Sequence, residues 1–173
     1  PPWLADGLDP ARPVIVEPAM AFGTGDHPTT RGVLRLMQSV IRSGVVVADL
    51  GAGSAVLAIA AVKLGAARAA AVELDADAIS NAEENVARNG VAGRVTVIEG
   101  DAAVVLPLLA PVRVVLANII SSVLTELLPV IRHSLTPHGV AISSGILAEE
   151  REEMLTVFAA GGWRVVREDA EEL

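Results

Sequence analysis

A glycine-containing turn, followed about twenty positions later by an acidic residue, constrains this chain more than any other feature. An apolar run leads into Asp49, two glycines follow at Gly51 and Gly53, and a second apolar run begins at Val56. This pattern predicts a buried strand, a tight turn and a helix, with bare backbone at the turn that a ligand can approach closely. Glu73 stands 22 positions after Gly51, at the end of the next apolar run, where a carboxylate accepts hydrogen bonds from ribose hydroxyls. Together they predict an adenosine-containing ligand at the carboxyl edge of a parallel sheet.

Two further polar residues are predicted to end strands at the same edge. Asp101 can accept a hydrogen bond from the exocyclic amine of adenine, or it can cap the helix that follows it. Asn118 can accept a hydrogen bond from a substrate amine and donate one to a ligand carboxylate, or it can be an ordinary strand-end amide. Glu73 is favoured over Asp75 as the ribose ligand, because Asp75 can instead cap the next helix.

The segment from Phe22 to Thr30 is the third candidate element, and it reads as a loop that leads into a helix. Its two glycines, Gly23 and Gly25, permit a close approach to a ligand, and Phe22, Gly23 and Thr24 are candidate cofactor contacts. Thr30 is predicted at a helix N-terminus, where the helix dipole favours an anionic group, although plain N-capping is the alternative. His27 can be a base, but a single loop histidine more often makes structural hydrogen bonds.

Apolar strands and helices alternate along most of the chain, which predicts a mostly parallel α/β sheet covered by helices on both faces. Residues 1–13 contain four prolines and are predicted to form a linker or arm, and residues 14–173 a single domain. The strands are expected at residues 45–50, 69–73, 94–99, 112–117, 140–144 and 163–167. The helices are expected from residue 29 and at 54–64, 77–89, 122–135 and 148–160, with a short helix or a loop at 101–109.

Composition narrows the class of protein and its surroundings. Although 52% of the residues are hydrophobic, only 2% are aromatic, which fits tightly packed small side chains. No apolar run reaches the roughly 18 residues of a membrane-spanning helix. The absence of cysteine excludes disulfides and thiolate metal sites, and the three histidines are not spaced as a metal set. We expect a cytoplasmic protein without a metal or a membrane partner.

The net charge of −8 also bears on partners. A nucleic acid would be repelled by the average field of such a chain, and no basic patch is evident. An acidic surface suits a basic protein partner, although most acidic proteins are merely soluble. The charge therefore favours a protein over a nucleic acid as the direct partner and leaves the oligomeric state open.

Several motifs, in their order along the chain, resemble the ribosomal protein methyltransferases of the PrmA type. They are Ala21-Phe-Gly-Thr-Gly-Asp-His-Pro-Thr-Thr30, Asp49-Leu-Gly-Ala-Gly-Ser54, Leu57-Ala-Ile-Ala-Ala61, Ala117-Asn-Ile119 and Ser144-Gly-Ile-Leu147. The first is highly specific, whereas the glycine turn alone is not. The resemblance covers nearly the whole chain from about residue 14.

The resemblance implies a doubly wound, seven-stranded, mostly parallel sheet of the S-adenosylmethionine-dependent methyltransferase (Rossmann-like) type. It also implies S-adenosylmethionine as cofactor, S-adenosylhomocysteine as product, and methylation of lysine side chains and the N-terminal amine of a large-subunit ribosomal protein. The cofactor-contacting positions of the family fall on Thr30, Gly51, Glu73 and Asn118, and Asn118 is predicted to orient the amine. Ala55 stands where the family has glycine, and Glu73 where it usually has Asp.

The family also has a small N-terminal domain that recognises the ribosomal protein, and we expect that this chain lacks it. The last strand of the sheet, a hairpin partner for residues 163–167, is expected to be missing as well. We therefore expect cofactor binding with poor methylation of the protein substrate. Methylation of another protein or a small molecule, a nicotinamide-dependent oxidoreductase and a non-catalytic binding module remain as alternatives.

Overall fold

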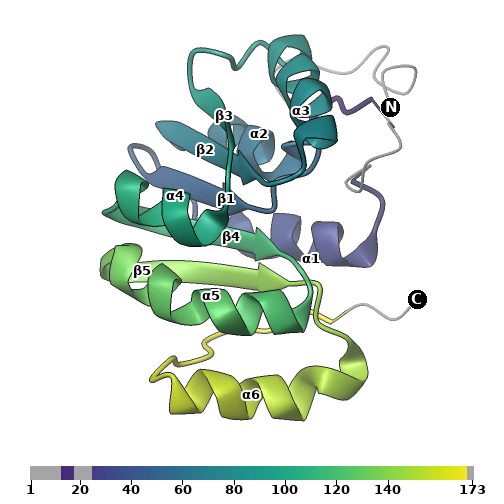
Figure 1. Ribbon diagram of the computed structural model, residues 1–173. Helices are drawn as coiled ribbons and strands as arrows, with labels where there is room; N and C mark the ends of the chain where they lie inside the picture. Colours follow the sequence, from purple (N-terminus) through teal and green to yellow (C-terminus); the bar gives the residue numbers. More distant parts are fainter. Residues whose placement is uncertain (1–12, 18–24, 171–173) are drawn as a thin grey trace.

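A five-stranded sheet organises the chain, with the strands in the order β3-β2-β1-β4-β5 (Figure 1). The computed structural model describes residues 13–17 and 25–170. Every neighbouring pair of strands is parallel, which confirms the predicted sheet. The strands are Val46–Leu50 (β1), Arg68–Glu73 (β2), Val95–Glu99 (β3), Val112–Asn118 (β4) and Leu135–Ser144 (β5).

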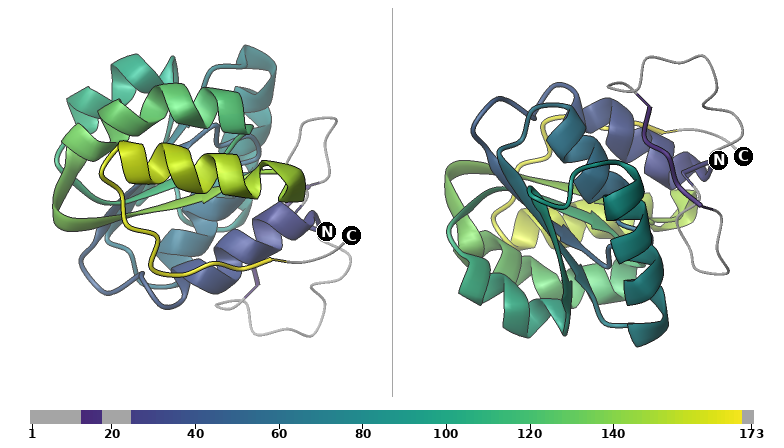
Figure 2. Two further views of the ribbon diagram at one scale, coloured as in Figure 1. Left: turned by 90° about the horizontal axis from the view of Figure 1, so that it is seen from below. Right: turned by 90° about the horizontal axis from the view of Figure 1, so that it is seen from above.

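Helices cover both faces of this sheet, so the predicted doubly wound arrangement is confirmed (Figures 1 and 2). One face carries α1, α2 and α3, and the other carries α4 and α5, with α6 beyond β5 packing on the side of α5. Pro129 neither ends nor divides α5. The helices are Pro28–Met37 (α1), Val56–Lys63 (α2), Ala76–Arg88 (α3), Ala102–Leu109 (α4), Ser121–Ser134 (α5) and Arg151–Ala160 (α6), with a 3-10 turn at Ala148–Glu150 (η2).

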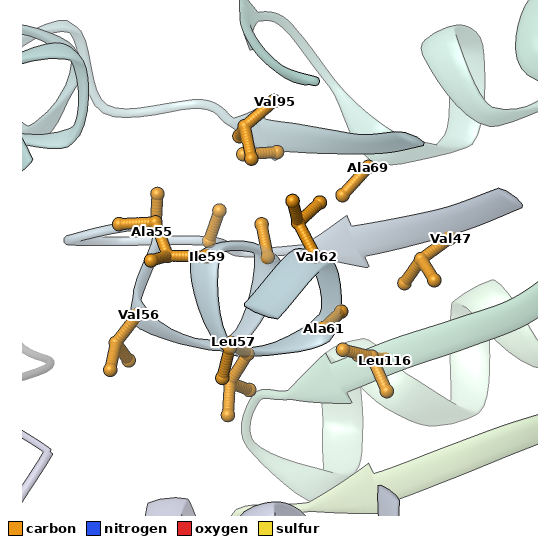
Figure 3. Packing of buried hydrophobic residues seen from close by; sticks show 14 of the residues in the cluster. Val47, Ala55, Val56, Leu57, Ile59, Ala61, Val62, Ala69, Val95 and Leu116 are labelled. Carbon is orange, nitrogen blue, oxygen red and sulfur yellow. The ribbon is translucent and has the colours of Figure 1, made fainter. Parts of the chain in front are cut away.

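Small side chains let the layers approach closely. Every residue of α2 except Lys63 is buried, and Ala71 beneath it on β2 is fully buried. Figure 3 shows the α2 side chains gathered with Val47, Val95 and Leu116 from three different strands. Successive strand residues point to opposite faces, so Ala71 joins the α2 side while Val72 joins the α4 and α5 side. The alanine-rich composition thus serves close helix–sheet packing.

The strand order contains a topological switch point. The chain runs outward from β1 to β2 and β3, and then crosses to the other side of β1 to form β4 and β5. The connections that leave the carboxyl ends of β1 and β4 therefore diverge to opposite faces of the sheet. In open α/β sheets, ligands bind at this divergence.

The strand predicted at residues 163–167 is wrong. Those residues form no ladder with β5, and Val166 is 72% exposed. The segment is instead held by charged side chains: Asp169 accepts two hydrogen bonds from Arg35 of α1, and Glu168 accepts two from Arg151. The Trp and two Val residues of this segment favour a strand locally, but a strand forms only where a neighbour pairs with its backbone. The described residues thus contain five of the seven strands of the implied architecture.

Most of the predicted arm, residues 1–12, lies outside the described residues. Residues 13–17 run in extended form against α3, and Val16 is buried in the core. Within residues 13–17 and 25–170, no helix combines the length and apolar character needed to cross a bilayer.

Overpacking the sheet beneath α2 should destabilise the fold. Replacing Ala71 with Leu adds three carbons where no space is available, and we expect a loss of about 1–3 kcal/mol in the free energy of unfolding. Ala67→Leu, at an exposed position of the preceding turn, is the control and should change it by less than about 0.5 kcal/mol. Urea denaturation measures both; equal effects would contradict the close packing.

Candidate functional site

Four neighbouring strands bring the predicted site residues to one edge of the sheet. Gly51 directly follows β1, Glu73 ends β2 and Asn118 ends β4, so these three flank the switch point. Asp101 follows β3, one strand further along. The predicted common edge is therefore present, because parallel neighbours place their carboxyl ends side by side.

The Glu73 carboxylate joins the glycine turn to the end of β2. Its Oε2 atom accepts a hydrogen bond of 2.7 Å from the Gly53 N–H, twenty residues earlier in the chain. Its Oε1 atom accepts from the backbone N–H groups of Leu74 and Asp75, at 2.8 and 3.0 Å. The side chain is half-buried, and a carboxylate has about four acceptor positions. Glu73 is thus held rigidly and retains acceptor capacity for a ligand hydroxyl.

Three residues of the turn have left-handed backbone, and one of them is not glycine. Gly51, Gly53 and Ala55 have φ angles of +65°, +52° and +61°. Ala55 is fully buried and is the N-cap residue before α2. Glycine adopts this left-handed conformation without steric cost, which explains the glycine that the family resemblance implies at this position. An L residue in this conformation costs about 1–2 kcal/mol, and such strain is typical of functional turns.

Part of the space beside Gly51 is filled by the protein itself, and the approach of a ligand to this backbone stays a prediction. A Cβ atom at Gly51 would lie 2.6 Å from Cγ2 of Ile119. A Cβ at Gly145, after β5, would lie 2.5 Å from the Ile119 carbonyl oxygen. Ile119 is therefore packed between two bare backbones, and this contact fixes the end of β4 against the glycine turn.

Asn118 connects the end of β4 to the start of α1. Its Nδ2 donates a hydrogen bond of 3.3 Å to Oγ1 of Thr30, which is buried. The hydroxyl of Ser144, at the end of β5, donates to the Thr29 carbonyl at 3.2 Å. Within the described part of the chain, no group donates a hydrogen bond to Oδ1, the side-chain carbonyl oxygen of Asn118. That oxygen is thus available to accept a hydrogen bond from a substrate.

The structural alternatives hold for His27, Asp75 and Asp101, whereas the N-capping alternative for Thr30 is wrong because Thr30 is the third residue of α1. His27 caps α1, because its Nδ1 accepts from the Thr29 N–H. Asp75 caps α3 and Asp101 caps α4 through hydrogen bonds from Asp77 N–H and Ala103 N–H. Asp101 is exposed and its second carboxylate oxygen accepts no hydrogen bond from the described residues, so its contact with adenine stays a prediction.

Asp49 is a buried acid whose importance the sequence did not reveal. It is 1% exposed, and Ala71 and Leu116 lie beside it on the neighbouring strands. Burial raises the pKa of its carboxyl group to about 8, against a smaller opposing effect of the hydrogen bond from the Ala58 N–H. The negative charge of Glu73 raises the pKa further. Oδ1 has no hydrogen-bond partner among residues 13–17 and 25–170, so a protonated carboxyl is the favoured state at neutral pH.

Two groups of predictions are not resolved by this geometry. Phe22, Gly23 and Thr24 lie outside the described residues, and their roles remain predictions. Among residues 13–17 and 25–170, no group of three or more His, Asp or Glu side chains is arranged to hold a metal ion.

The sequence of the chain matches a known protein family. The family model described as ribosomal protein L11 methyltransferase (PrmA) matches residues 3–172. The chain belongs to this family. The ribosomal protein L11 methyltransferase of Pelotomaculum thermopropionicum is 41% identical over 162 residues, covering 91% of this chain and 51% of that protein. That of Thermus thermophilus is 41% identical over 159 residues, covering 92% of this chain and 61% of that protein.

Solved structures agree with the family. The crystal structure of the ribosomal protein L11 methylase from Lactobacillus delbrueckii subsp. bulgaricus superposes with a TM-score of 0.81 at 28% identity, covering 92% of this chain and 80% of that chain. An RNA methyltransferase from Salinibacter ruber, solved with S-adenosyl-L-homocysteine, gives a TM-score of 0.58 at 27% identity, covering 64% of this chain and 72% of that chain. The chain thus has the methyltransferase fold, and it spans about half the length of the curated relatives that it matches.

The buried carboxyl of Asp49 should make the stability of this PrmA-family chain depend on pH. The folded state keeps a proton at this site that the unfolded chain releases above about pH 4. The free energy of unfolding should therefore fall as the pH rises from about 4 to 8. Asp49→Asn keeps the shape without the titration, so its stability should fall less between pH 5 and pH 8 in urea denaturation. Asp77→Asn, at an exposed position, is the control, and a wild-type slope in Asp49→Asn would contradict the assignment.

Proposed function

We propose that this chain is the catalytic domain of an S-adenosylmethionine-dependent protein N-methyltransferase. The observation that carries the proposal is the junction at the switch point, where Glu73 binds the glycine turn through Gly53 and Asn118 lies on the adjacent strand. Membership of the PrmA family supports it. In this proposal residues 14–173 form the methyltransferase domain, and residues 1–13 a linker or arm.

The residues at this edge fit the cofactor. Glu73 accepts hydrogen bonds from the ribose hydroxyls, since its carboxylate is already aimed at the glycine turn. Asp101, exposed at the end of the next strand, accepts from the adenine amine. Gly51 and Gly53 lie beneath the nucleoside. Thr30 and Asn118 hold the methionine end, and the segment with Phe22, Gly23 and Thr24 completes the site.

Methyl transfer to an amine needs a neutral nucleophile, aligned and shielded from water. S-adenosylmethionine, when bound, supplies an electrophilic methyl group. Asn118 accepts a hydrogen bond from the incoming amine through its carbonyl oxygen, which orients the nitrogen lone pair. A lysine amine is mostly protonated near neutrality, so it must lose a proton, and a partly dry site lowers its pKa. His27 caps a helix and is not needed as a base.

The exposed apolar residues beside Asn118 favour a macromolecular acceptor. Ile120 is 64% exposed and Leu147 is 58% exposed. Glu150 holds their segments together by accepting hydrogen bonds from the Ser121 hydroxyl at 2.6 Å and from the Leu147 N–H at 2.9 Å. A protein seated there would bury these side chains and exclude water from the amine.

We infer that the acceptor is a basic ribosomal protein of the large subunit, methylated at lysine side chains and at the N-terminal amine. The relatives are named ribosomal protein L11 methyltransferases, and a chain with a net charge of −8 attracts a basic partner. The reaction takes place in the cytoplasm, and the chain makes no direct contact with nucleic acid. In this proposal, substrate selection depends on the part of the relatives that lies outside the match to this chain.

Ligand binding separates this function from the alternatives. We expect isothermal titration calorimetry to show binding of S-adenosylmethionine and S-adenosylhomocysteine, and none of NAD, because the site must hold a methionine end rather than a second nucleotide. Glu73→Ala should weaken both by about tenfold or more, since it removes the ribose contact and leaves the Gly53 N–H unpaired. NAD binding alone would indicate an oxidoreductase, and no response at all a binding module.

Removing the Asn118 amide should affect turnover more than folding. Asn118→Ala deletes the group that orients the amine, and we expect a loss of about a hundredfold in the rate of methyl transfer to a large-subunit ribosomal protein. The rate is measured with radiolabelled S-adenosylmethionine and excess chain. Thr125→Ala, at an exposed position of α5, is the control. An unchanged rate in Asn118→Ala would remove this residue from the site.

A further inference from the structure

Asn85 of α3 is a buried amide that belongs to none of the groups described above. It has no exposed surface, and it occupies the apolar face of α3 together with Ala78, Ala82 and Val86. Its Oδ1 accepts from the backbone N–H of Glu17 at 3.0 Å and from Arg88 at 2.9 Å. Its Nδ2 donates to the Ser54 carbonyl at 3.2 Å and to Asn81 at 3.3 Å. All four hydrogen-bonding positions of the amide are therefore used.

One side of this amide holds the extended segment 13–17. We call residues 13–17 the arm segment, which shares only Pro13 with the arm predicted at residues 1–13. Asn89, one helical turn after Asn85, accepts from the Ile15 N–H at 2.9 Å and donates to the Ile15 carbonyl at 2.6 Å. Lys63 donates to the Pro13 carbonyl at 2.7 Å. These contacts are made to backbone atoms, so they fix the position and direction of the arm segment more than its sequence.

The other side of the amide supports the glycine turn. Ser54 lies between Gly53 and Ala55, which both have left-handed backbone. Its carbonyl is buried with the residue, and the hydrogen bond from Asn85 satisfies it. Gly53 in turn donates to Glu73. The Asn85 side chain thus lies between the arm segment and the glycine turn, whose Gly53 N–H binds Glu73, the residue proposed to bind ribose.

We propose that Asn85 is a positioning residue that couples docking of the arm segment to the shape of the cofactor turn. The inference rests on the proposed function. Because the amide is fully satisfied and buried, it cannot rotate without leaving a polar group unpaired, and this makes its two sides move together. The coupling is reciprocal: a bound cofactor favours the docked arm segment, and a docked arm segment favours the cofactor-binding turn. Any domain that precedes the arm segment then acts on the cofactor site through Asn85.

A matched pair of substitutions separates this role from ordinary stabilisation. Asn85→Asp keeps the acceptor for the Glu17 N–H and removes the donor to Ser54. Asn89→Asp introduces the same charge one turn away on the same helix, keeps the acceptor for the Ile15 N–H, and removes the donor to the arm segment. Only the first breaks the link to the turn.

S-adenosylhomocysteine binding, measured by calorimetry, should weaken about tenfold in Asn85→Asp and less than about twofold in Asn89→Asp. Hydrogen exchange gives the second measurement. The ligand should slow exchange of the Ile15 and Glu17 amides in the wild type and in Asn89→Asp, but not in Asn85→Asp. Without ligand, exchange of the Ala55 amide should be faster in Asn85→Asp than in Asn89→Asp.

Equal affinities in the two variants would overturn the coupling, whatever their thermal stabilities. If Asn85→Asp does not fold, hydrogen exchange of the wild type is the test. The proposal would be overturned if S-adenosylhomocysteine did not slow exchange of the Ile15 and Glu17 amides. A wild type that bound no S-adenosylhomocysteine would refute the proposed function instead. The comparison of Ala55 exchange between the variants needs no ligand and tests the link between Asn85 and the turn, so equal exchange in the two variants would overturn the proposal.

Discussion

The hydrogen bond between the Glu73 carboxylate and the Gly53 N–H is the contact on which the site depends. It closes a loop of 20 residues and ties the end of β2 to the turn after β1. The bond forms only because β1 and β2 are parallel neighbours in the register Leu50↔Val72, which brings their carboxyl ends to the same height. The sheet thus places the acid, and the acid fixes the left-handed turn.

Two buried polar side chains, Asp49 and Asn85, stabilise the glycine turn. Asp49 accepts from the Ala58 N–H at the start of α2, and Asn85 donates to the Ser54 carbonyl within the turn. The first bond satisfies an N–H group in the first turn of α2, and the second satisfies a buried carbonyl within the turn. Ala55 adds conformational strain of about 1–2 kcal/mol at the same place. The surrounding alanine-rich core compensates for these unfavourable contributions.

The sequence predicted the parallel sheet and the edge at which the site lies, because strand and helix periodicities are local and the two glycines and Glu73 stand at fixed spacing. It did not predict the end of the chain, since a strand at residues 163–167 depends on a pairing partner that local composition does not encode. It also missed Asn85 and Ile119. Asn85 occupies an apolar position of the α3 repeat, which is a readable signal, whereas the packing of Ile119 against Gly51 and Gly145 follows only from the order of β1, β4 and β5.

Ile119 also limits the movement of Asn118, the proposed orienting group. The Ile119 backbone packs against the Gly145 backbone, and the Ile119 side chain packs against Gly51. These two contacts oppose sideways movement of Ile119. Asn118 is therefore held by the backbone as well as by its hydrogen bond to Thr30. Displacement at carbon requires aligned reacting atoms, and a misplacement of about 1 Å can cost about a hundredfold in rate. Two glycines at different strand ends, far apart in the sequence, thus both let the end of β4 lie immediately beside the glycine turn.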